Sequence, residues 1–195
     1  MIIDIINKKL EDTETKKDTI KIWFIKEILQ SEVLDFIYQN KSYKNIIFYG
    51  WTAIRFLLGL NRLSEDLDFL WQWFNDFEQL WRDLKEYFIN QHKIKVDYKI
   101  QKFRITLKFR DFLQTFNLQY DNSNDLYLKI EISDHFDFCK NYKTKYYPII
   151  YQNKSILIYS LDESTLFATK LNAVLYRQRA KNKNSTDIKV KWRDF

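Results

Sequence analysis

Apolar residues recur along this chain with two periods, and segments of the two kinds alternate. Spacing near 3.6 residues predicts helices at 14–39, 52–60, 76–91 and 162–179. Alternation of apolar and polar residues predicts strands at 45–49, 66–71, 126–132 and 155–159, with two more between 93 and 109. Because the two kinds of element mix without a strict strand–helix–strand rhythm, the pattern predicts an α+β fold.

The strand predicted at 66–71 carries two carboxylates. Asp66 and Asp68 are two residues apart, so their side chains point to one face, while Leu67 and Phe69 point to the other face and into a core. Two adjacent like charges raise each other's pKa unless a cation lies between them. Hard oxygen ligands of this kind suit Mg²⁺, which completes its coordination with water and substrate phosphates.

A glycine turn precedes this carboxylate pair. Gly50 follows a predicted strand and opens a predicted helix, where backbone N–H groups and the helix dipole favour a phosphate. A phosphate-binding turn followed by paired carboxylates is the outline of a phosphoryl-transfer site. The alternative interpretation is a hairpin turn followed by a solvated acidic strand edge.

The residues around this turn keep the spacing of a known signature. The segment resembles the nucleotidyltransferase signature of the DNA polymerase beta superfamily. More closely, it resembles the AbiEii/AbiGii toxin family, whose pattern runs Gly-Gly-Thr-Ala-Leu-Arg, a short apolar helix, then Arg-x-Ser-x-Asp-Leu-Asp-Phe. The positions in register here are Gly50, Thr52, Ala53, Arg55, Arg62, Ser64, Asp66, Leu67, Asp68 and Phe69. The resemblance implies a nucleotidyltransferase fold with a mixed β-sheet flanked by helices.

One position departs from the family pattern. Where the family has a second glycine, or a serine, this chain has Trp51. A tryptophan brings a large ring to the mouth of the phosphate turn. Either the ring stacks on a base, or it marks a weakened nucleotide site.

Two further charged residues match the family in other segments. Glu131 lies on the strand predicted at 126–132, and a similar Lys-x-Glu-Ile strand in the family implies a third ligand or base; the alternative is an exposed cross-strand ion pair. Lys170 matches the lysine of the family helix Ala-Thr-Lys-Leu-x-Ala-Leu-x-x-Arg. Its ammonium suits triphosphate oxygens, whereas the alternative is a solvated helix lysine.

The end of the chain resembles the start of another family stretch, Arg-Asp-x-Tyr-Asp-Leu. Asp194 takes the place of its acidic residue, and the sequence stops three residues into the motif. We therefore expect a shortened C-terminal helical part. The expected organisation is a single nucleotidyltransferase-like domain, 1–195, with an α/β core at about 14–160 and the start of the helical part at 161–195.

Composition bears on the partners of the protein and on its cellular location. The formal net charge is +6, and the segment 170–193 holds eight Lys and Arg residues against Asp187 alone. Such a segment suits nucleic-acid phosphates, although a solvated basic tail has the same composition. With one cysteine there is no internal disulfide. We see neither a signal peptide nor a membrane-spanning run, so we expect a soluble, cytoplasmic protein.

The resemblance implies a metal-dependent nucleotidyltransferase toxin that transfers NMP from an NTP to an RNA acceptor, with tRNA expected. It also implies a cognate antitoxin protein in a phage-defence toxin–antitoxin system, and no membrane partner. Mg²⁺ or Mn²⁺ would be held by Asp66 and Asp68. Catalytic roles fall on Asp66, Asp68, Glu131, Lys170 and Asp194, and nucleotide contacts on Gly50, Trp51, Thr52, Arg55, Ser64 and Lys170. The alternatives are a degenerate, non-catalytic binding module of the same fold and a small-molecule (antibiotic) nucleotidyltransferase.

Overall fold

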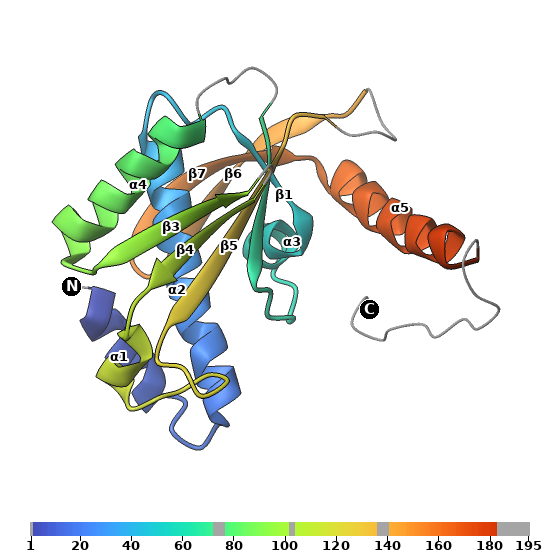
Figure 1. The fold of residues 1–195 in the computed structure, drawn as a ribbon. Coiled ribbons are helices and arrows are strands. Elements are labelled where there is room, and N and C mark those ends of the chain that lie inside the picture. Colours follow the sequence, from blue (N-terminus) through green and yellow to red (C-terminus); the bar gives the residue numbers. More distant parts are fainter. Residues whose placement is uncertain (1, 72–76, 102–103, 136–140, 183–195) are drawn as a thin grey trace.

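A seven-stranded mixed β-sheet forms the centre of the molecule (Figure 1). The computed structural model describes residues 2–71, 77–101, 104–135 and 141–182. The strands are β1 (Ile47–Tyr49), β2 (Asp66–Leu70), β3 (Val96–Gln101), β4 (Arg104–Phe109), β5 (Leu126–Ser133), β6 (Thr144–Tyr151) and β7 (Lys154–Leu161). They lie in the order β3-β4-β5-β2-β1-β7-β6, and the β2–β5 and β1–β7 pairs are parallel. The predicted α+β class with a mixed sheet is confirmed.

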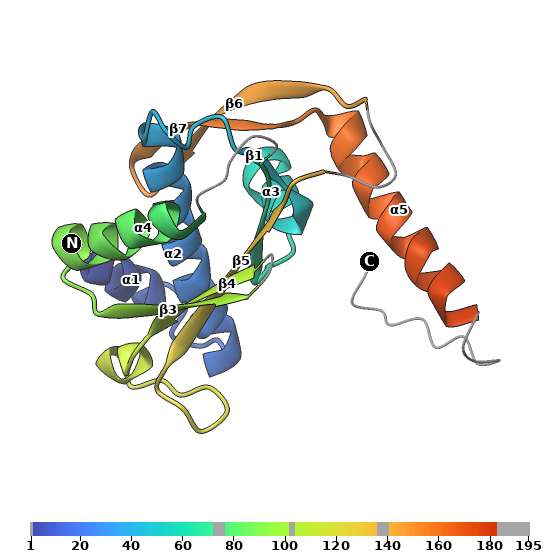
Figure 2. The same cartoon turned by 45° about the horizontal axis from the view of Figure 1, so that its top comes forward.

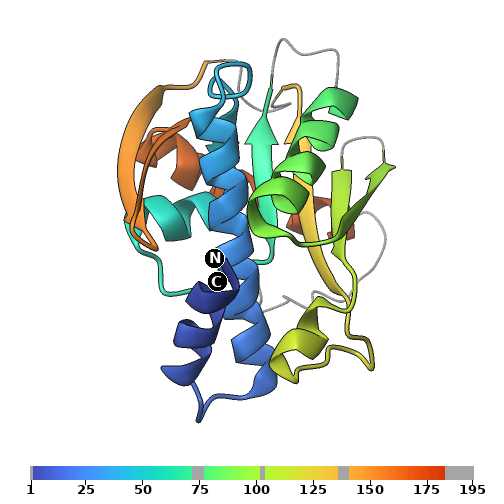
Figure 3. The ribbon, with the colours of Figure 1, turned by 90° about the vertical axis from the view of Figure 1, so that its left-hand side faces the viewer.

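Helices lie on both sides of the sheet. One face carries α1 (Ile2–Glu11), α2 (Asp18–Gln39) and α4 (Phe77–His92), which lie in front of the sheet in Figure 3. On the other side, α3 (Gly50–Leu58) packs against β1 and β2, and α5 (Glu163–Asn182) lies beside α3 and extends away from the sheet (Figure 2). A short 3₁₀ helix, η1 (Phe112–Phe116), follows β4. No helix in the described ranges has both the length and the apolar character needed to span a bilayer.

The main core lies between the sheet and α2. Leu67 and Phe69 of β2 are fully buried there, as their alternation with the two aspartates predicts, and the Phe69 ring lies 5.2 Å from that of Phe48 on β1. Burying side chains of this size stabilises the fold by about 1.5–3 kcal/mol each. The apolar face of β2 therefore fixes the strand, and this directs its two carboxylates to the opposite face.

Three elements were not predicted from the sequence: α1, η1 and β6. The β6 strand carries Pro148 and pairs with β7 alone, so it forms one edge of the sheet. Proline lacks the N–H that a central strand must donate, and it is tolerated where one side of the strand has no partner. Because this apolar run contains a proline, its sequence does not predict the edge strand that it forms.

Candidate active site

The strand register brings three carboxylates to one face of the sheet. Asp68 on β2 lies directly opposite Glu131 on β5, and Asp66 lies opposite Lys129 two residues earlier. On its other side, Asp68 pairs with Tyr49 of β1. Side chains of paired residues point to the same face, so the structure places Glu131 beside the two aspartates. Its role as a ligand or base stays a prediction.

The structure disfavours the ionised form of both aspartates, and their pKa values are raised. Burial raises the pKa of Asp68 to about 6; the nearby Lys170 opposes that shift, while Glu131 and Asp66 add to it. Burial also raises the pKa of Asp66, against the pull of Lys129. A divalent cation would relieve both the desolvation and the mutual repulsion.

The aspartate pair fits a metal that draws the rest of its coordination from water and substrate. Among the described residues, no group of three or more His, Cys, Asp and Glu side chains is arranged to hold a metal ion. The third carboxylate is engaged elsewhere, because Arg104 on β4 donates from Nε to Glu131 Oε1 at 2.7 Å and also from its Nη2. Asp66 and Asp68 suit Mg²⁺, which commonly binds through one or two carboxylates and substrate phosphates.

Gly50 is packed directly against Asp68. It has φ +89°, and a Cβ built on it would lie 2.8 Å from Asp68 Cγ and 2.9 Å from Asp68 Cβ. Next to it, the fully buried Thr52 donates its hydroxyl to the carbonyl oxygen of Asp66. These two contacts fasten the first turn of α3 to β2. The free N–H groups of that turn therefore lie next to the carboxylates, where an anion would be favoured.

The Trp51 ring makes cation–π contacts with two side chains. The Arg62 guanidinium carbon lies 4.7 Å from the centroid of the ring, and Lys170 Nζ lies 5.1 Å from it. Both distances are within the range of cation–π attraction. Lys170 comes from α5, so this contact brings a residue distant in sequence into the same cluster as Asp68. The positive φ of the turn falls on Gly50, and Trp51 does not share it.

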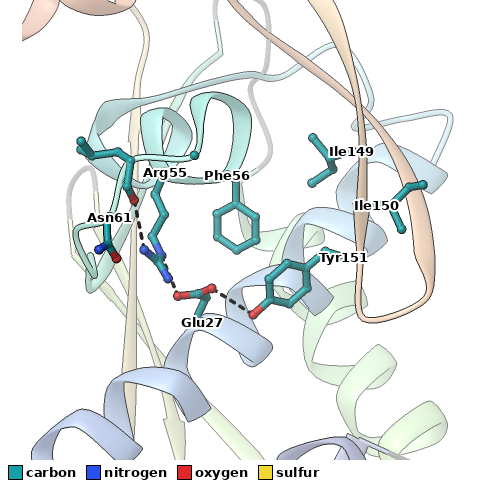
Figure 4. A pocket seen from close by; sticks show the side chains of 9 residues that line it. Glu27, Arg55, Phe56, Asn61, Ile149, Ile150 and Tyr151 are labelled. Carbon is teal, nitrogen blue, oxygen red and sulfur yellow. Dashed lines mark hydrogen bonds and ion pairs between the residues drawn. The ribbon is translucent and has the colours of Figure 1, made fainter. Parts of the chain in front are cut away.

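Two of the predicted nucleotide contacts have other partners in this structure. The Arg55 guanidinium bonds through Nε to Glu27 Oε2 of α2 at 2.7 Å and through Nη1 to the Leu60 carbonyl at 3.1 Å. Figure 4 shows Arg55 with Glu27 and Tyr151 in the lining of a cavity of about 300 Å³. The half-buried Ser64 accepts a bond from Gln30 through its carbonyl oxygen. Their nucleotide contacts stay predictions, and Asp194 lies outside the described residues.

Sequence reasoning missed two neighbours of the carboxylates, Tyr49 and Arg104, and one neighbour of Trp51, Arg62. Tyr49 sits beside Asp68 with its hydroxyl 3.4 Å from the Ser133 hydroxyl, and burial raises its pKa to about 12. Arg104 holds Glu131, and Arg62 covers Trp51. Arg62 belongs to the family pattern and so left a signal. Arg104 and Tyr49 become neighbours only through strand register, which the sequence does not reveal.

This chain is similar to a known protein family and to solved structures. The family described as nucleotidyl transferase AbiEii toxin, of a type IV toxin–antitoxin system, matches residues 34–195. A similar solved structure is MenT4, a nucleotidyltransferase toxin from Mycobacterium tuberculosis H37Rv, with a TM-score of 0.60 and 13% identity over 85% of this chain. A putative nucleotidyltransferase from H. pylori matches with a TM-score of 0.47 and 19% identity over 86% of the chain.

This chain matches only part of each of these solved structures. This chain spans 57% of the length of MenT4 and 63% of the H. pylori protein. At this level of identity, the likeness to MenT4 shows a shared fold. No curated protein sequence matches the chain.

Proposed function

This chain belongs to the AbiEii nucleotidyltransferase toxin family, and we propose that it transfers NMP from an NTP to an RNA acceptor. The observation that carries the proposal is the meeting of Asp66, Asp68 and Lys170 at the first turn of α3. We take tRNA as the first acceptor to test. The proposal includes a cognate antitoxin protein and a role in phage defence.

In the proposed reaction, each residue of the cluster has one task. Asp66 and Asp68 would hold Mg²⁺ or Mn²⁺, which when bound neutralises charge that develops on the triphosphate. Lys170 binds phosphate oxygens as a compact point charge, and the N–H groups at the start of α3 bind them as dipoles. An acceptor hydroxyl attacks the α-phosphorus and pyrophosphate leaves.

The proton of the acceptor hydroxyl needs a base. Glu131 lies on β5 opposite Asp68, and it is the one carboxylate of the three that we do not assign to the metal. We therefore assign the role of base to it. Both hydrogen bonds from Arg104 go to Glu131 Oε1, so Arg104 does not bind Oε2, and Oε2 is the oxygen we assign to the acceptor hydroxyl.

The test is transfer of label into RNA. Wild type, Asp68→Asn and the control Asp12→Asn, an exposed carboxylate on the turn after α1, are incubated with each labelled NTP, Mg²⁺ and total tRNA. We expect label in RNA with wild type and Asp12→Asn and none with Asp68→Asn. In a parallel reaction an aminoglycoside replaces the tRNA; label on the aminoglycoside and none in RNA would support the small-molecule enzyme.

A second candidate function is a non-catalytic module of the same fold that binds nucleotide or RNA. Two observations favour it: Trp51 replaces the second glycine of the family turn, and Arg104 engages the carboxylate that would serve as base. Calorimetric titration of NTP and Mg²⁺ into the wild-type protein distinguishes the two. Binding without transfer of any of the four NMPs would establish the module.

A further inference from the structure

The face of the sheet that carries the three carboxylates continues from β2 across β5, β4 and β3. Lys129 on β5 lies between Asp66 on one side and Thr106 of β4 on the other, and Thr106 in turn pairs with Lys99 of β3. These four residues form one row across the sheet. At about 4.8 Å between neighbouring strands, the row runs roughly 14 Å from Asp66 to Lys99.

The two neighbouring rows mix cations with carboxylates. Arg104 pairs with Glu131, and Lys108 pairs with Tyr127 on one side and with Asp97 of β3 on the other. The strand residues between them, such as Leu107 and Ile130, are buried against the core on the opposite face. We call this surface the cationic face and define it by Lys99, Arg104, Thr106, Lys108, Tyr127 and Lys129.

The side chains of the cationic face are available to a partner. Lys99, Arg104 and Lys129 are exposed, and Tyr127 keeps 42% of its surface in solvent. An exposed aromatic ring next to a row of cations is the combination that binds single-stranded nucleic acid, since the cations follow the backbone and the ring stacks on a base.

Positive charge on this face is only partly compensated. Arg104 is paired with Glu131, and Lys108 with Asp125 at 2.7 Å. Asp97, in register with Lys108, adds a further carboxylate to this face and is itself paired with Arg110. Lys99 and Lys129 make no salt bridge within the described residues, although Lys129 does act on Asp66 through space. The uncompensated charge thus lies in the row that ends at the aspartate pair.

We propose that the cationic face binds the single-stranded end of the acceptor RNA and leads its terminal hydroxyl to Asp66 and Asp68. This inference rests on the proposed function and names the route of its acceptor. A single strand suits the surface because one row of cations can follow one backbone, whereas a duplex presents two. Lys99 and Lys129 would contact successive parts of the backbone, and Tyr127 would stack on a base.

The test measures binding apart from transfer. A fluorescent single-stranded RNA oligonucleotide is titrated in EDTA, without NTP, at several salt concentrations between 50 and 200 mM. Variants are the double substitution Lys99→Gln/Lys129→Gln and the charge-matched control Lys8→Gln/Lys16→Gln, whose exposed lysines lie on and after α1. DNA of the same sequence and the RNA duplex form the remaining arms.

Loss of two phosphate contacts should flatten the salt dependence. Each contact contributes about 0.7 to the slope of log K against log salt for single strands. Between 50 and 200 mM salt, wild type should therefore lose about sevenfold more affinity than the Lys99→Gln/Lys129→Gln variant. The control should keep the wild-type slope. Tyr127→Leu should bind more weakly than Tyr127→Phe, which preserves the ring.

Several results would overturn the inference. These are a wild-type slope in the Lys99→Gln/Lys129→Gln variant, an equal loss in the control, or tighter binding of duplex or DNA than of single-stranded RNA. If such a result came with normal transfer of label into tRNA, the proposed function would stand and the route would be wrong. Binding as expected without any transfer would leave the surface as an RNA site and refute the proposed reaction.

Discussion

Substitution of Gly50 by alanine tests whether the glycine exists to admit Asp68. The new Cβ would lie 2.8 Å from Asp68 Cγ, whereas carbon atoms in contact prefer about 3.5–4.0 Å. The carboxylate must therefore retreat by roughly 1 Å, and a misplacement of that size costs on the order of 100-fold in rate. The positive φ adds about 1–2 kcal/mol of lost stability.

Gly59→Ala is the matched control, because Gly59 has φ +70° but no atom within 4 Å of the position its Cβ would take. It should lose similar stability, about 2–8 °C in Tm, and keep the wild-type rate of transfer. Thermal unfolding and transfer of labelled NMP are measured on both variants. A Gly50→Ala protein that transfers at the wild-type rate would refute the assignment of Asp68 as a metal ligand, as would a Gly59→Ala protein that loses as much activity.

Substitutions at three other positions test the cluster. Asp68→Asn should abolish transfer yet raise metal-free stability above pH 6 by up to about 3 kcal/mol; a folded pKa of about 6 against 3.8 means that native Asp68 holds more protons, so wild-type stability falls as pH rises from 3.8 to 6. Lys170→Ala should weaken NTP binding and slow transfer, and Lys170→Arg should rescue only in part. Trp51→Phe should keep most of the NTP affinity, whereas Trp51→Leu should lose about 0.5–2 kcal/mol with the cation–π contacts.

A different result would contradict each of these three predictions. Denaturant unfolding that shows equal stability for wild type and Asp68→Asn at pH 7.5 would remove the burial penalty assigned to Asp68. Calorimetry that finds the same NTP affinity with and without the Lys170 ammonium would return that residue to a solvated helix position. Equal NTP affinity in Trp51→Phe and Trp51→Leu would show that ring electrostatics play no part.

The sequence predicts well whatever depends on near neighbours along the chain. Alternation of Asp66 and Asp68 with Leu67 and Phe69 is a property of five consecutive residues, and it correctly separates the two faces of β2. Strand register is not such a property, because it is set by the packing of the whole sheet. The pairing of Glu131 with both Asp68 and Arg104 therefore had to come from the structure.

Trp51 shows how a departure from a family pattern gains meaning from structure. Sequence alone offered two interpretations, a ring that stacks on a base and a ring that marks a weakened turn. The structure adds a third, because the ring holds Arg62 and Lys170 while Gly50 alone takes the positive φ of the turn. A ring in that position costs the turn no backbone strain and keeps the α5 lysine near Asp68. The substitution is therefore compatible with a working phosphate site, and under the proposed function the two cations on the ring would meet the incoming triphosphate.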